Sequence, residues 1–241
     1  KGEVTYLRPS IRRRYIIIGG NDMVAGIVEQ IFRTHRSTWW KKILFVFCKP
    51  TILIQTSRDV EEFRMELFSN LTESEQRHVV IYYGNRTSKR DIAKLKVRSA
   101  KEVYIIGEDV RSDDTESYHD TMNMHCLKLV SEQIKEITRF QKDAVKGDNR
   151  LVCRVMFEYQ TTFNIFQVTD IDGSKIKFLP FNYYEMWAQK VLVCKELGED
   201  VDKYSYLPLE GKDGIRPTDE DFVHFVVVGM SRMGLAMAIE A

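Results

Sequence analysis

The chain has few cysteines, and they lie far apart in the sequence. None of the four belongs to a Cys-x-x-Cys pair, so the pattern predicts neither a zinc knuckle nor a disulfide framework. Isolated cysteines of this kind are typical of a reducing, cytosolic compartment. The four are Cys48, Cys126, Cys153 and Cys194.

Long apolar runs are also missing. The most apolar neighbourhood, residues 39–54, is interrupted by three lysines and a proline, so it does not provide the roughly 20 apolar residues that a membrane-spanning helix needs. It is consistent with a buried strand that follows an aromatic loop, or with a segment that touches a bilayer surface. Residues 1–14 are polar and basic and lack the apolar stretch of a secretory signal peptide.

Neither the charge balance nor the motifs indicate nucleic-acid binding or hydrolytic chemistry. With 36 basic and 35 acidic residues the formal net charge is +1, so no overall field attracts nucleic acid, and we expect none as a partner. The chain has no Gly-Lys-Ser/Thr phosphate loop, no Ser-His-Asp order and no nucleophile elbow. We therefore expect no catalytic residue and no enzymatic activity.

From Arg14 onward, short apolar strands alternate with longer helical patterns, which is typical of a parallel α/β sheet. The sequence predicts a Rossmann-like, doubly wound parallel sheet with helices on both faces. The predicted strands are Tyr15–Ile18, Ile52–Thr56, His78–Tyr83, Val103–Ile106, Leu151–Phe157 and Lys175–Leu179. The predicted helices are Met23–Arg33, Val60–Leu71, Lys89–Lys96, Thr115–Ile134, Thr161–Val168 and Tyr183–Val193.

The domain organisation follows from composition. Residues 1–13 form a basic lead-in, residues 14–195 the Rossmann-like domain, and residues 196–221, with their glycines and prolines, a linker. Residues 222–241 repeat the opening pattern of strand, glycine turn and helix, and stop inside the predicted helix. We expect them to be the first strand and helix of a second, similar domain.

The first glycine turn is a degenerate form of a dinucleotide-binding fingerprint. In that fingerprint one glycine makes the turn, a second admits the pyrophosphate and a third packs helix on strand. Here Gly19 is followed by Asn21 and Val24 at the second and third places, with Gly20 and Gly26 nearby. A nucleotide site and an ordinary tight turn both account for this pattern, although the helix N-terminus favours an anion.

The second glycine turn is closer to the fingerprint. It has Gly229, Ser231 and Gly234, and Arg232 adds positive charge beside a bound phosphate. The acidic residue expected at the end of the second strand is missing from the first copy: Ser57 ends that strand, and Asp59 comes about two residues too late. This weakens an interpretation as an NAD site.

The run from Val79 to Val110 resembles the RCK or KTN (TrkA-N type) regulatory domains of potassium channels and transporters. In the family, a strand is followed by a Gly-Asp-Ala-Thr-like turn, a short helix, an Ala-x-x-Val-Ile strand and a later Asp-x-x-Asn. The matching positions here are Gly84, Asn85 and Thr87 in the turn, Leu95 and Ala100 in packing positions, Glu108 and Asp109 after the strand, and Asp120 with Asn123.

The resemblance covers roughly residues 14–193. It implies a non-catalytic, ligand-sensing gating domain on the cytoplasmic side of a membrane, the fragment itself being soluble. It also implies NAD(H) or an adenine nucleotide as cofactor, a nucleotide or ion as effector, self-association into a dimer or ring, and a membrane pore or transporter subunit as partner. Asn85 and Ser57 depart from acidic positions of the family, so an empty first site is the alternative.

The candidate site residues fall into groups by the part of a nucleotide that each is expected to contact. Gly19, Gly20, Asn21 and Asp22 are expected at the phosphate, Ser57 and Arg58 beside the ribose, and Gly84, Asn85, Gly107 and Glu108 around the base. Gly229, Ser231, Arg232 and Gly234 form the corresponding turn of the second copy.

Other interpretations remain open at this level. His119 and His125 lie among Asp113, Asp114, Glu116 and Asp120, but six-residue spacing separates the two histidines on a helix, and acidic residues at a helix N-terminus are favourable without a metal. We predict no metal site. A nicotinamide-dependent oxidoreductase fragment and a ligand-free Rossmann-like assembly module are the alternatives to a regulatory domain.

Overall fold

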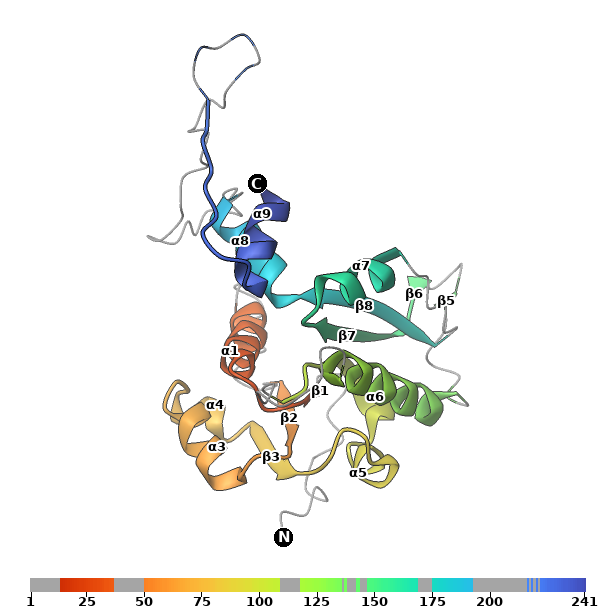
Figure 1. Cartoon of the computed structure of the whole chain (residues 1–241). Coiled ribbons are helices and arrows are strands. Elements are labelled where there is room, and N and C mark those ends of the chain that lie inside the picture. Colours follow the sequence, from red (N-terminus) through yellow and green to blue (C-terminus); the bar gives the residue numbers. More distant parts are fainter. Residues whose placement is uncertain are drawn as a thin grey trace.

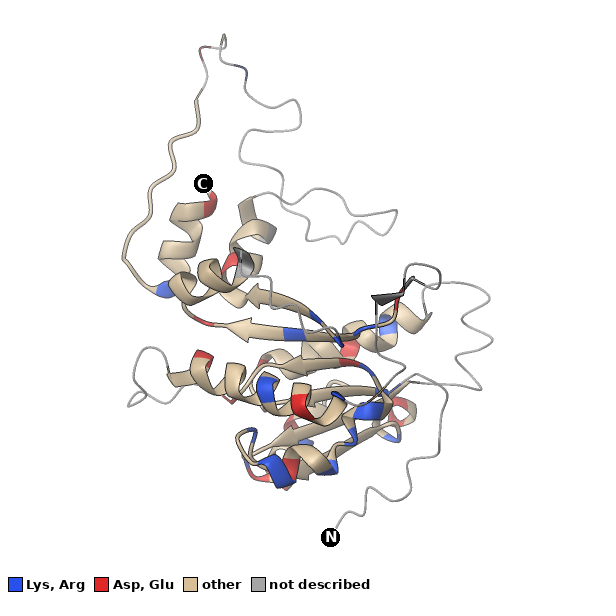
Figure 2. Ribbon diagram, turned by 90° about the vertical axis from the view of Figure 1, so that its right-hand side faces the viewer, with Lys and Arg blue, Asp and Glu red and all other residues tan. Residues whose placement is uncertain are grey.

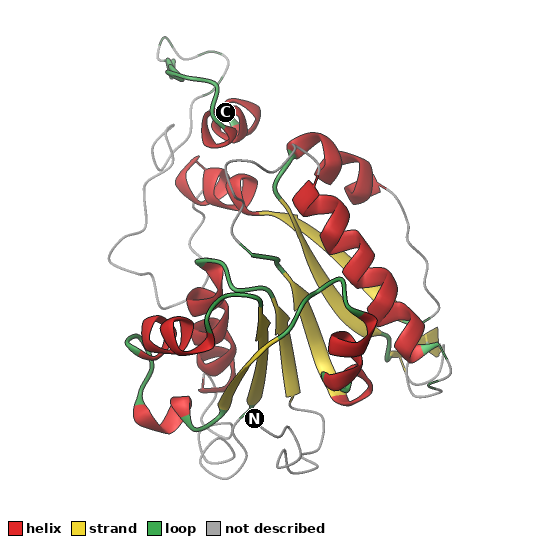
Figure 3. Ribbon diagram, turned by 60° about the horizontal axis from the view of Figure 1, so that its bottom comes forward, coloured by secondary structure: helices red, strands yellow, loops and turns green. Residues whose placement is uncertain are grey.

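The computed structural model describes residues 14–36, 50–108, 118–135, 137, 142–143, 147–168, 175–192, 216, 218, 220 and 222–241. Six parallel strands form one sheet in the order β3-β2-β1-β4-β7-β8 (Figures 1 and 3). This is the Rossmann-like α/β fold that the sequence predicts. The strands are β1 (Arg14–Ile18), β2 (Thr51–Thr56), β3 (Val79–Tyr83), β4 (Ala100–Ile105), β7 (Leu151–Phe157) and β8 (Ile176–Asn182).

Helices cover both faces of the sheet. The described helices are α1 (Met23–Arg36), α3 (Val60–Phe68), α4 (Glu73–Gln76), α5 (Lys89–Lys94), the short 3-10 helix η2 (Val97–Ser99), α6 (Tyr118–Ile134), α7 (Gln160–Val168), α8 (Tyr183–Leu192) and α9 (Arg232–Glu240). Two-residue strands β5 (Lys142–Asp143) and β6 (Gly147–Asp148) pair with each other. Basic and acidic residues alternate along several of these helices (Figure 2).

Strand β1 divides the core into two layers, because alternate side chains of a strand point to opposite faces. Ile16 and Ile18 pack with the cluster beneath α5, α6 and α7, whereas Tyr15 and Ile17 pack with the cluster beneath α1 and α3. All five residues of β1 are buried. Since each face of β1 is covered, an apolar run without polar alternation is the pattern expected for a central parallel strand.

The order of strands reverses between β1 and β4, which lie side by side although β2 and β3 come between them in sequence. A doubly wound sheet places its ligand crevice at this point, outside the carboxyl ends of the strands. The loops that follow β1, β2, β3, β4 and β7 meet at this edge, which we call the rim. The candidate residues of the first glycine turn, and those that follow β2, β3 and β4, therefore all lie at the rim.

Two predicted helices end earlier in the structure than in the sequence analysis. The helix expected over Val60–Leu71 ends at Phe68, and α4 follows as a separate turn. The helix expected over Lys89–Lys96 ends at Lys94, because Lys96 adopts a left-handed backbone with φ 50°. Asp59 caps α3, accepting hydrogen bonds from the N–H groups of Glu61 and Glu62 at 3.0 and 2.9 Å.

The C-terminal segment differs from its prediction in one respect. Residues 222–228 form no strand, since none of the described strands pairs with them, and Val226 and Val228 are 67% and 94% exposed. The predicted helix is present as α9, which packs against α8 (Figure 1). Whether residues 222–241 begin a second domain stays a prediction, and the lead-in and most of the linker lie outside the described residues.

Two further observations concern the helices. Among the helices that the structure describes, none is both long enough and apolar enough to cross a bilayer. The predicted helix over Thr115–Ile134 is present from Tyr118, and its first three residues lie outside the described part of the chain.

Candidate functional site

At the rim, the turn after β1 crosses the turn after β4 in direct contact. The N–H of Gly107 donates to the carbonyl of Ile18 at 3.1 Å, and the N–H of Gly19 donates to the carbonyl of Gln55 at 2.8 Å. A Cβ on Gly19 would lie 2.0 Å from the carbonyl oxygen of Gly107. Both glycines have positive φ, 127° and 72°, so neither position tolerates a side chain without strain.

Beside this crossing, Gly20 leaves room for two side chains from other strands. A Cβ on Gly20 would lie 2.2 Å from Oγ1 of Thr56 and 2.8 Å from Oε2 of Glu108. The Glu108 carboxylate accepts hydrogen bonds from the Ser57 N–H at 2.7 Å and the Thr56 hydroxyl at 3.0 Å. Glu108 therefore lies at the tip of β2, where the sequence analysis had expected ribose contacts, and not in the neighbourhood assigned to the base.

Arg58 lies on the other side of the same turn. Its guanidinium donates to the Gly20 carbonyl at 3.0 Å and pairs with Glu66 at 2.8 Å, and it stands 5.2 Å from the centre of the Phe63 ring. The turn that was expected to bind phosphate thus has the Arg58 cation at the Gly20 carbonyl and the Glu108 carboxylate beside Gly20. The predicted pair Ser57 and Arg58 is brought to the turn as expected.

Asn21 has a structural role at the start of α1. Its Oδ1 accepts from the Met23 N–H at 3.1 Å, which caps the helix, and its Nδ2 donates to the Ile106 carbonyl at 3.2 Å. The side chain is 6% exposed, so little of it faces solvent, whereas Asp22 is exposed. The prediction placed both residues at a phosphate, and the structure separates them.

The predicted residues after β3 form a turn of their own. Oδ1 of Asn85 accepts from the N–H and hydroxyl of Thr87 at 2.9 and 2.8 Å, and a Cβ on Gly84 would lie 2.9 Å from Nε2 of Gln55. Their neighbour Arg86, which the sequence analysis did not select, reaches the rim. Its Nη1 donates to Oδ1 of Asn123 at 2.7 Å and would lie 1.7 Å from a Cβ on Gly107.

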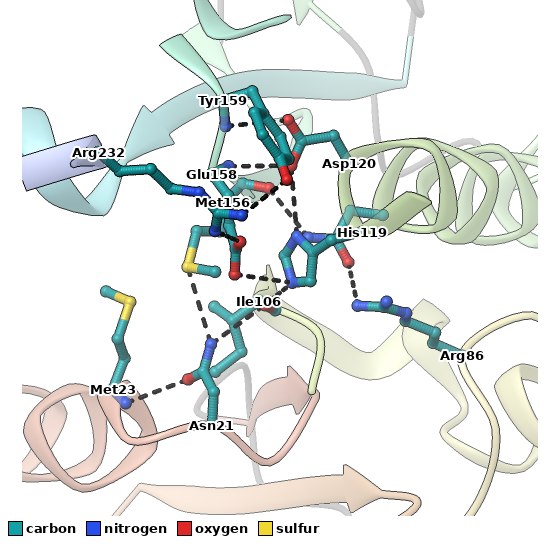
Figure 4. A network of polar contacts seen from close by, with 11 residues as sticks. Asn21, Met23, Arg86, Ile106, His119, Asp120, Met156, Glu158, Tyr159 and Arg232 are labelled. Atoms are coloured by element: carbon teal, nitrogen blue, oxygen red, sulfur yellow. Dashed lines mark hydrogen bonds and ion pairs between the residues drawn. The ribbon is translucent and has the colours of Figure 1, made fainter. Parts of the chain in front are cut away.

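A buried polar network continues from this point into α6 (Figure 4). Nε2 of His119 lies 3.1 Å from the Ile106 carbonyl, the same carbonyl that Asn21 contacts, and Nδ1 lies 3.3 Å from Oδ1 of Asp120. Because a carbonyl oxygen only accepts hydrogen bonds, we assign a proton to Nε2. His119 and Asp120 are 2% and 1% exposed, so each depends on these protein partners.

Asp120 fixes the loop that follows β7. Its carboxylate accepts hydrogen bonds from the N–H groups of Glu158 and Tyr159 at 2.9 and 3.2 Å. These bonds hold the Glu158 side chain 3.9 Å from Nε2 of His119. Burial raises the pKa of Glu158 above its usual value, although His119 and Arg232 oppose the shift.

Arg232, from the second glycine turn, contacts this loop after β7. Its Nη1 pairs with Oε2 of Glu158, its Nη2 donates to the Tyr159 hydroxyl at 2.7 Å, and its guanidinium stands 4.5 Å from the centre of the Tyr159 ring (Figure 4). The sequence analysis had placed Arg232 beside a phosphate of the second copy. In the structure its guanidinium joins α9 to Glu158 and Tyr159 in the loop after β7.

The rest of the second turn is open to solvent. Gly229 has φ 100° with nothing within 4 Å of a Cβ, and a Cβ on Gly234 would lie 2.5 Å from the Gly229 carbonyl oxygen. Ser231 caps α9 by accepting from the Gly234 N–H at 3.2 Å. Gly229, Ser231 and Gly234 therefore lie together in one turn, and Arg232 points away from them to the loop after β7.

Two charged residues at the rim that sequence reasoning did not select are Arg86 and Glu158. The signal for Glu158 was its position directly after a buried strand, at the edge where ligands bind. His119 had been considered only as a metal ligand, and Asp120 as a metal ligand and as part of the Asp-x-x-Asn motif. The structure buries His119 and leaves His125 exposed, and in the part of the chain that it describes, no group of three or more histidine, cysteine, aspartate or glutamate side chains is arranged to hold a metal.

The rim accommodates some features of a dinucleotide and not others. Gly19, Gly20 and Gly107 admit close contacts with the backbone and side chains of the chain itself, and Glu108 presents carboxylate oxygens at the tip of β2. The Asn21 cap already satisfies one N–H of the α1 terminus. The residues present therefore suit contacts with a ribose better than contacts with a phosphate at the N-terminus of α1.

No family model matches the chain, and no curated protein is similar to it in sequence. The solved structures that match the chain include an NAD(P)-binding domain, a channel and a dehydrogenase. The NAD(P)-binding domain of an exopolyphosphatase-related protein from Archaeoglobus fulgidus is 14% identical, with a TM-score of 0.42 over 74% of this chain and 93% of that one.

The GsuK channel bound to NAD is 12% identical, with a TM-score of 0.40 over 80% of this chain and 27% of the channel chain. The Cj0485 dehydrogenase is 12% identical, with a TM-score of 0.27 over 76% of this chain and 81% of that one. Because all three TM-scores are below 0.5, we infer neither fold, ligand nor activity from these structures.

The raised pKa of Glu158 predicts a pH dependence of stability. The folded chain holds this proton at pH values where the unfolded chain has lost it, so this carboxyl stabilises the fold at low pH. That contribution is lost as the pH rises from the usual value of 4.5 through the raised pKa. Replacing Glu158→Gln removes the titration, and urea midpoints measured from pH 4 to pH 8 should then fall less with rising pH than in the wild type. Parallel curves would contradict the assignment.

Proposed function

We propose that the chain is a ligand-sensing regulatory domain of the RCK/KTN type, without catalytic activity, that belongs to a potassium channel or potassium transport system. It acts on the cytoplasmic side of the membrane and binds NAD(H) or an adenine nucleotide at the rim beside Gly19 and Gly20. The run from Val79 to Val110 supports the family, because its packing positions Leu95 and Ala100 are buried, as the resemblance requires.

One observation carries the regulatory part of the proposal. A continuous path of polar contacts leads from the first glycine turn to α9, the element that follows the linker (Figure 4). Asn21 and His119 share the Ile106 carbonyl, His119 faces Glu158, and Glu158 pairs with Arg232. A ligand that moves the turn therefore changes the environment of a helix outside the sheet.

The mechanism is a shift between two populations. A ligand favours the arrangement to which it binds more tightly, and the difference in affinity is the free energy available for gating. Buried polar groups suit this purpose, because breaking one contact leaves an unpaired group whose desolvation costs about 1–3 kcal/mol. The path from Asn21 to Arg232, in which Asp120 fixes the position of Glu158, consequently favours one of two discrete positions of α9 over intermediate ones.

A ligand-free assembly module is the second candidate, and a specific observation favours it. The side chains of Thr56 and Glu108 lie against Gly20, and Asn21 already caps α1. In that case the glycines of the turn would only permit the close backbone contact with Gly107. The two candidates differ in whether a nucleotide stabilises the chain.

We expect a nucleotide to stabilise the chain and to protect α9. NAD⁺, NADH, ATP and ADP are titrated against thermal unfolding, and the one that binds, at ~100 times its Kd, should add about 2.7 kcal/mol of stability. Hydrogen exchange of the α9 amides should slow with the same ligand. Arg232→Gln should keep the binding and lose the response of α9.

The control for that experiment is Arg64→Gln. It removes the same charge from an exposed ion pair with Glu61 on α3 and should leave both responses unchanged. Stabilisation by none of the nucleotides would contradict the sensor and favour the assembly module. Stabilisation with unchanged exchange in α9 would contradict the coupling.

Self-association through α8 is part of the same proposal. Tyr183, Met186 and Trp187 are 40%, 54% and 40% exposed on this helix, and clustered apolar side chains of this kind favour a partner surface. Light scattering at high micromolar concentration should show a dimer or larger ring. Trp187→Glu should shift it to monomer, while Met65→Glu, at an exposed position of α3, should not. A monomeric wild type would contradict this part.

A further inference from the structure

Rossmann domains commonly carry an acidic residue at the end of the second strand, where it accepts hydrogen bonds from the adenosine ribose hydroxyls. In this chain β2 ends with Thr56, followed by Ser57 and Arg58, none of which is acidic. Asp59 is engaged as the cap of α3. The usual source of the ribose acceptor is therefore absent from β2.

The structure places a carboxylate at the same point from a different strand. Glu108 follows β4, which is separated from β2 by β1, and its side chain passes beside the turn after β1 to reach Ser57. The passage needs the missing side chain of Gly20, whose Cβ would lie 2.8 Å from Oε2 of Glu108. The second glycine of the turn thus makes room for a side chain of the chain itself.

The Glu108 carboxylate retains capacity for a ligand. An ionised carboxylate offers about four acceptor positions. Among the residues that the structure describes, two donors use these positions, the Ser57 N–H at 2.7 Å and the Thr56 hydroxyl at 3.0 Å. The remaining positions are enough for the two neighbouring hydroxyls of a ribose, and Glu108 is only partly buried.

The cation near this point is directed elsewhere. In sites for 2′-phosphorylated dinucleotides, an arginine beside the second strand accommodates the extra phosphate. Arg58 stands at that place, but its guanidinium donates to the Gly20 carbonyl at 3.0 Å and pairs with Glu66 at 2.8 Å. A 2′-phosphate at the tip of β2 would meet the carboxylate of Glu108, and like charges repel.

We propose that Glu108 replaces the missing acid of β2, and that it makes the rim select dinucleotides with a free 2′-hydroxyl, NAD(H), over 2′-phosphorylated ones, NADP(H). The inference rests on the proposed nucleotide site and names its ligand class. Glu108 acts as a specificity-determining residue that contacts the ribose. Gly20 is the position that lets it reach the tip of β2.

The test measures the Kd of NAD⁺ and NADP⁺ for the full chain by calorimetry, in the wild type and in Glu108→Gln. The wild type should prefer NAD⁺ by ~30-fold or more, which is ~2 kcal/mol. In Glu108→Gln the preference should fall below ~3-fold, because the amide still accepts one hydroxyl but no longer repels a phosphate.

The matched control is Glu62→Gln, which removes the same charge from an exposed position of α3 and should keep the wild-type preference. Wild-type chain that binds both dinucleotides equally, or NADP⁺ more tightly, overturns the role of Glu108 and leaves the nucleotide sensor standing. Wild-type chain that binds ATP or ADP but neither dinucleotide also overturns it. Binding of no nucleotide at all overturns both proposals. The wild-type ratio decides these outcomes even where Glu108→Gln fails to fold.

Discussion

The rim depends on one close backbone crossing, at which the turn after β1 passes against the turn after β4. Gly19 and Gly107 meet there with no space for a Cβ on Gly19. The crossing brings the Ile106 carbonyl between Asn21 and His119, and it brings Glu108 within reach of Ser57. Because β1 and β4 are neighbours only through the reversal of strand order, the fold itself creates this contact.

From the crossing, the rim continues as a network of buried polar groups that satisfy one another. Burial of a charged group without partners costs far more than a domain of this size can tolerate, so these contacts determine each other's positions. Asp120 holds the backbone of the β7 loop, and that loop holds Glu158 where it meets both His119 and Arg232. A helix that follows the linker is thereby connected to the sheet edge at which nucleotides bind in this fold.

Sequence reasoning predicted the elements well, and the long-range contacts less well. Apolar runs such as β1 are buried on both faces, and the helix after Ser231 begins at a capping residue, so local patterns determined both. The contact between Glu108 and Ser57 joins residues 51 positions apart across an intervening strand, and no local pattern encodes it. Likewise, residues 225–228 have strand composition but lack a described neighbour with which to pair.

The central claim is that the first glycine turn and α9 are energetically coupled through the rim. Asn21 and Arg232 lie at opposite ends of a series of contacts through Ile106, His119 and Glu158, and Asn21 also contacts Sδ of Met156 in the strand that leads to Glu158. A double-mutant cycle with Asn21→Ala and Arg232→Gln, measured as free energies of unfolding in urea, tests this directly. Coupling predicts that the two effects deviate from additivity by ~0.7 kcal/mol or more, whereas additivity within ~0.3 kcal/mol would contradict the account.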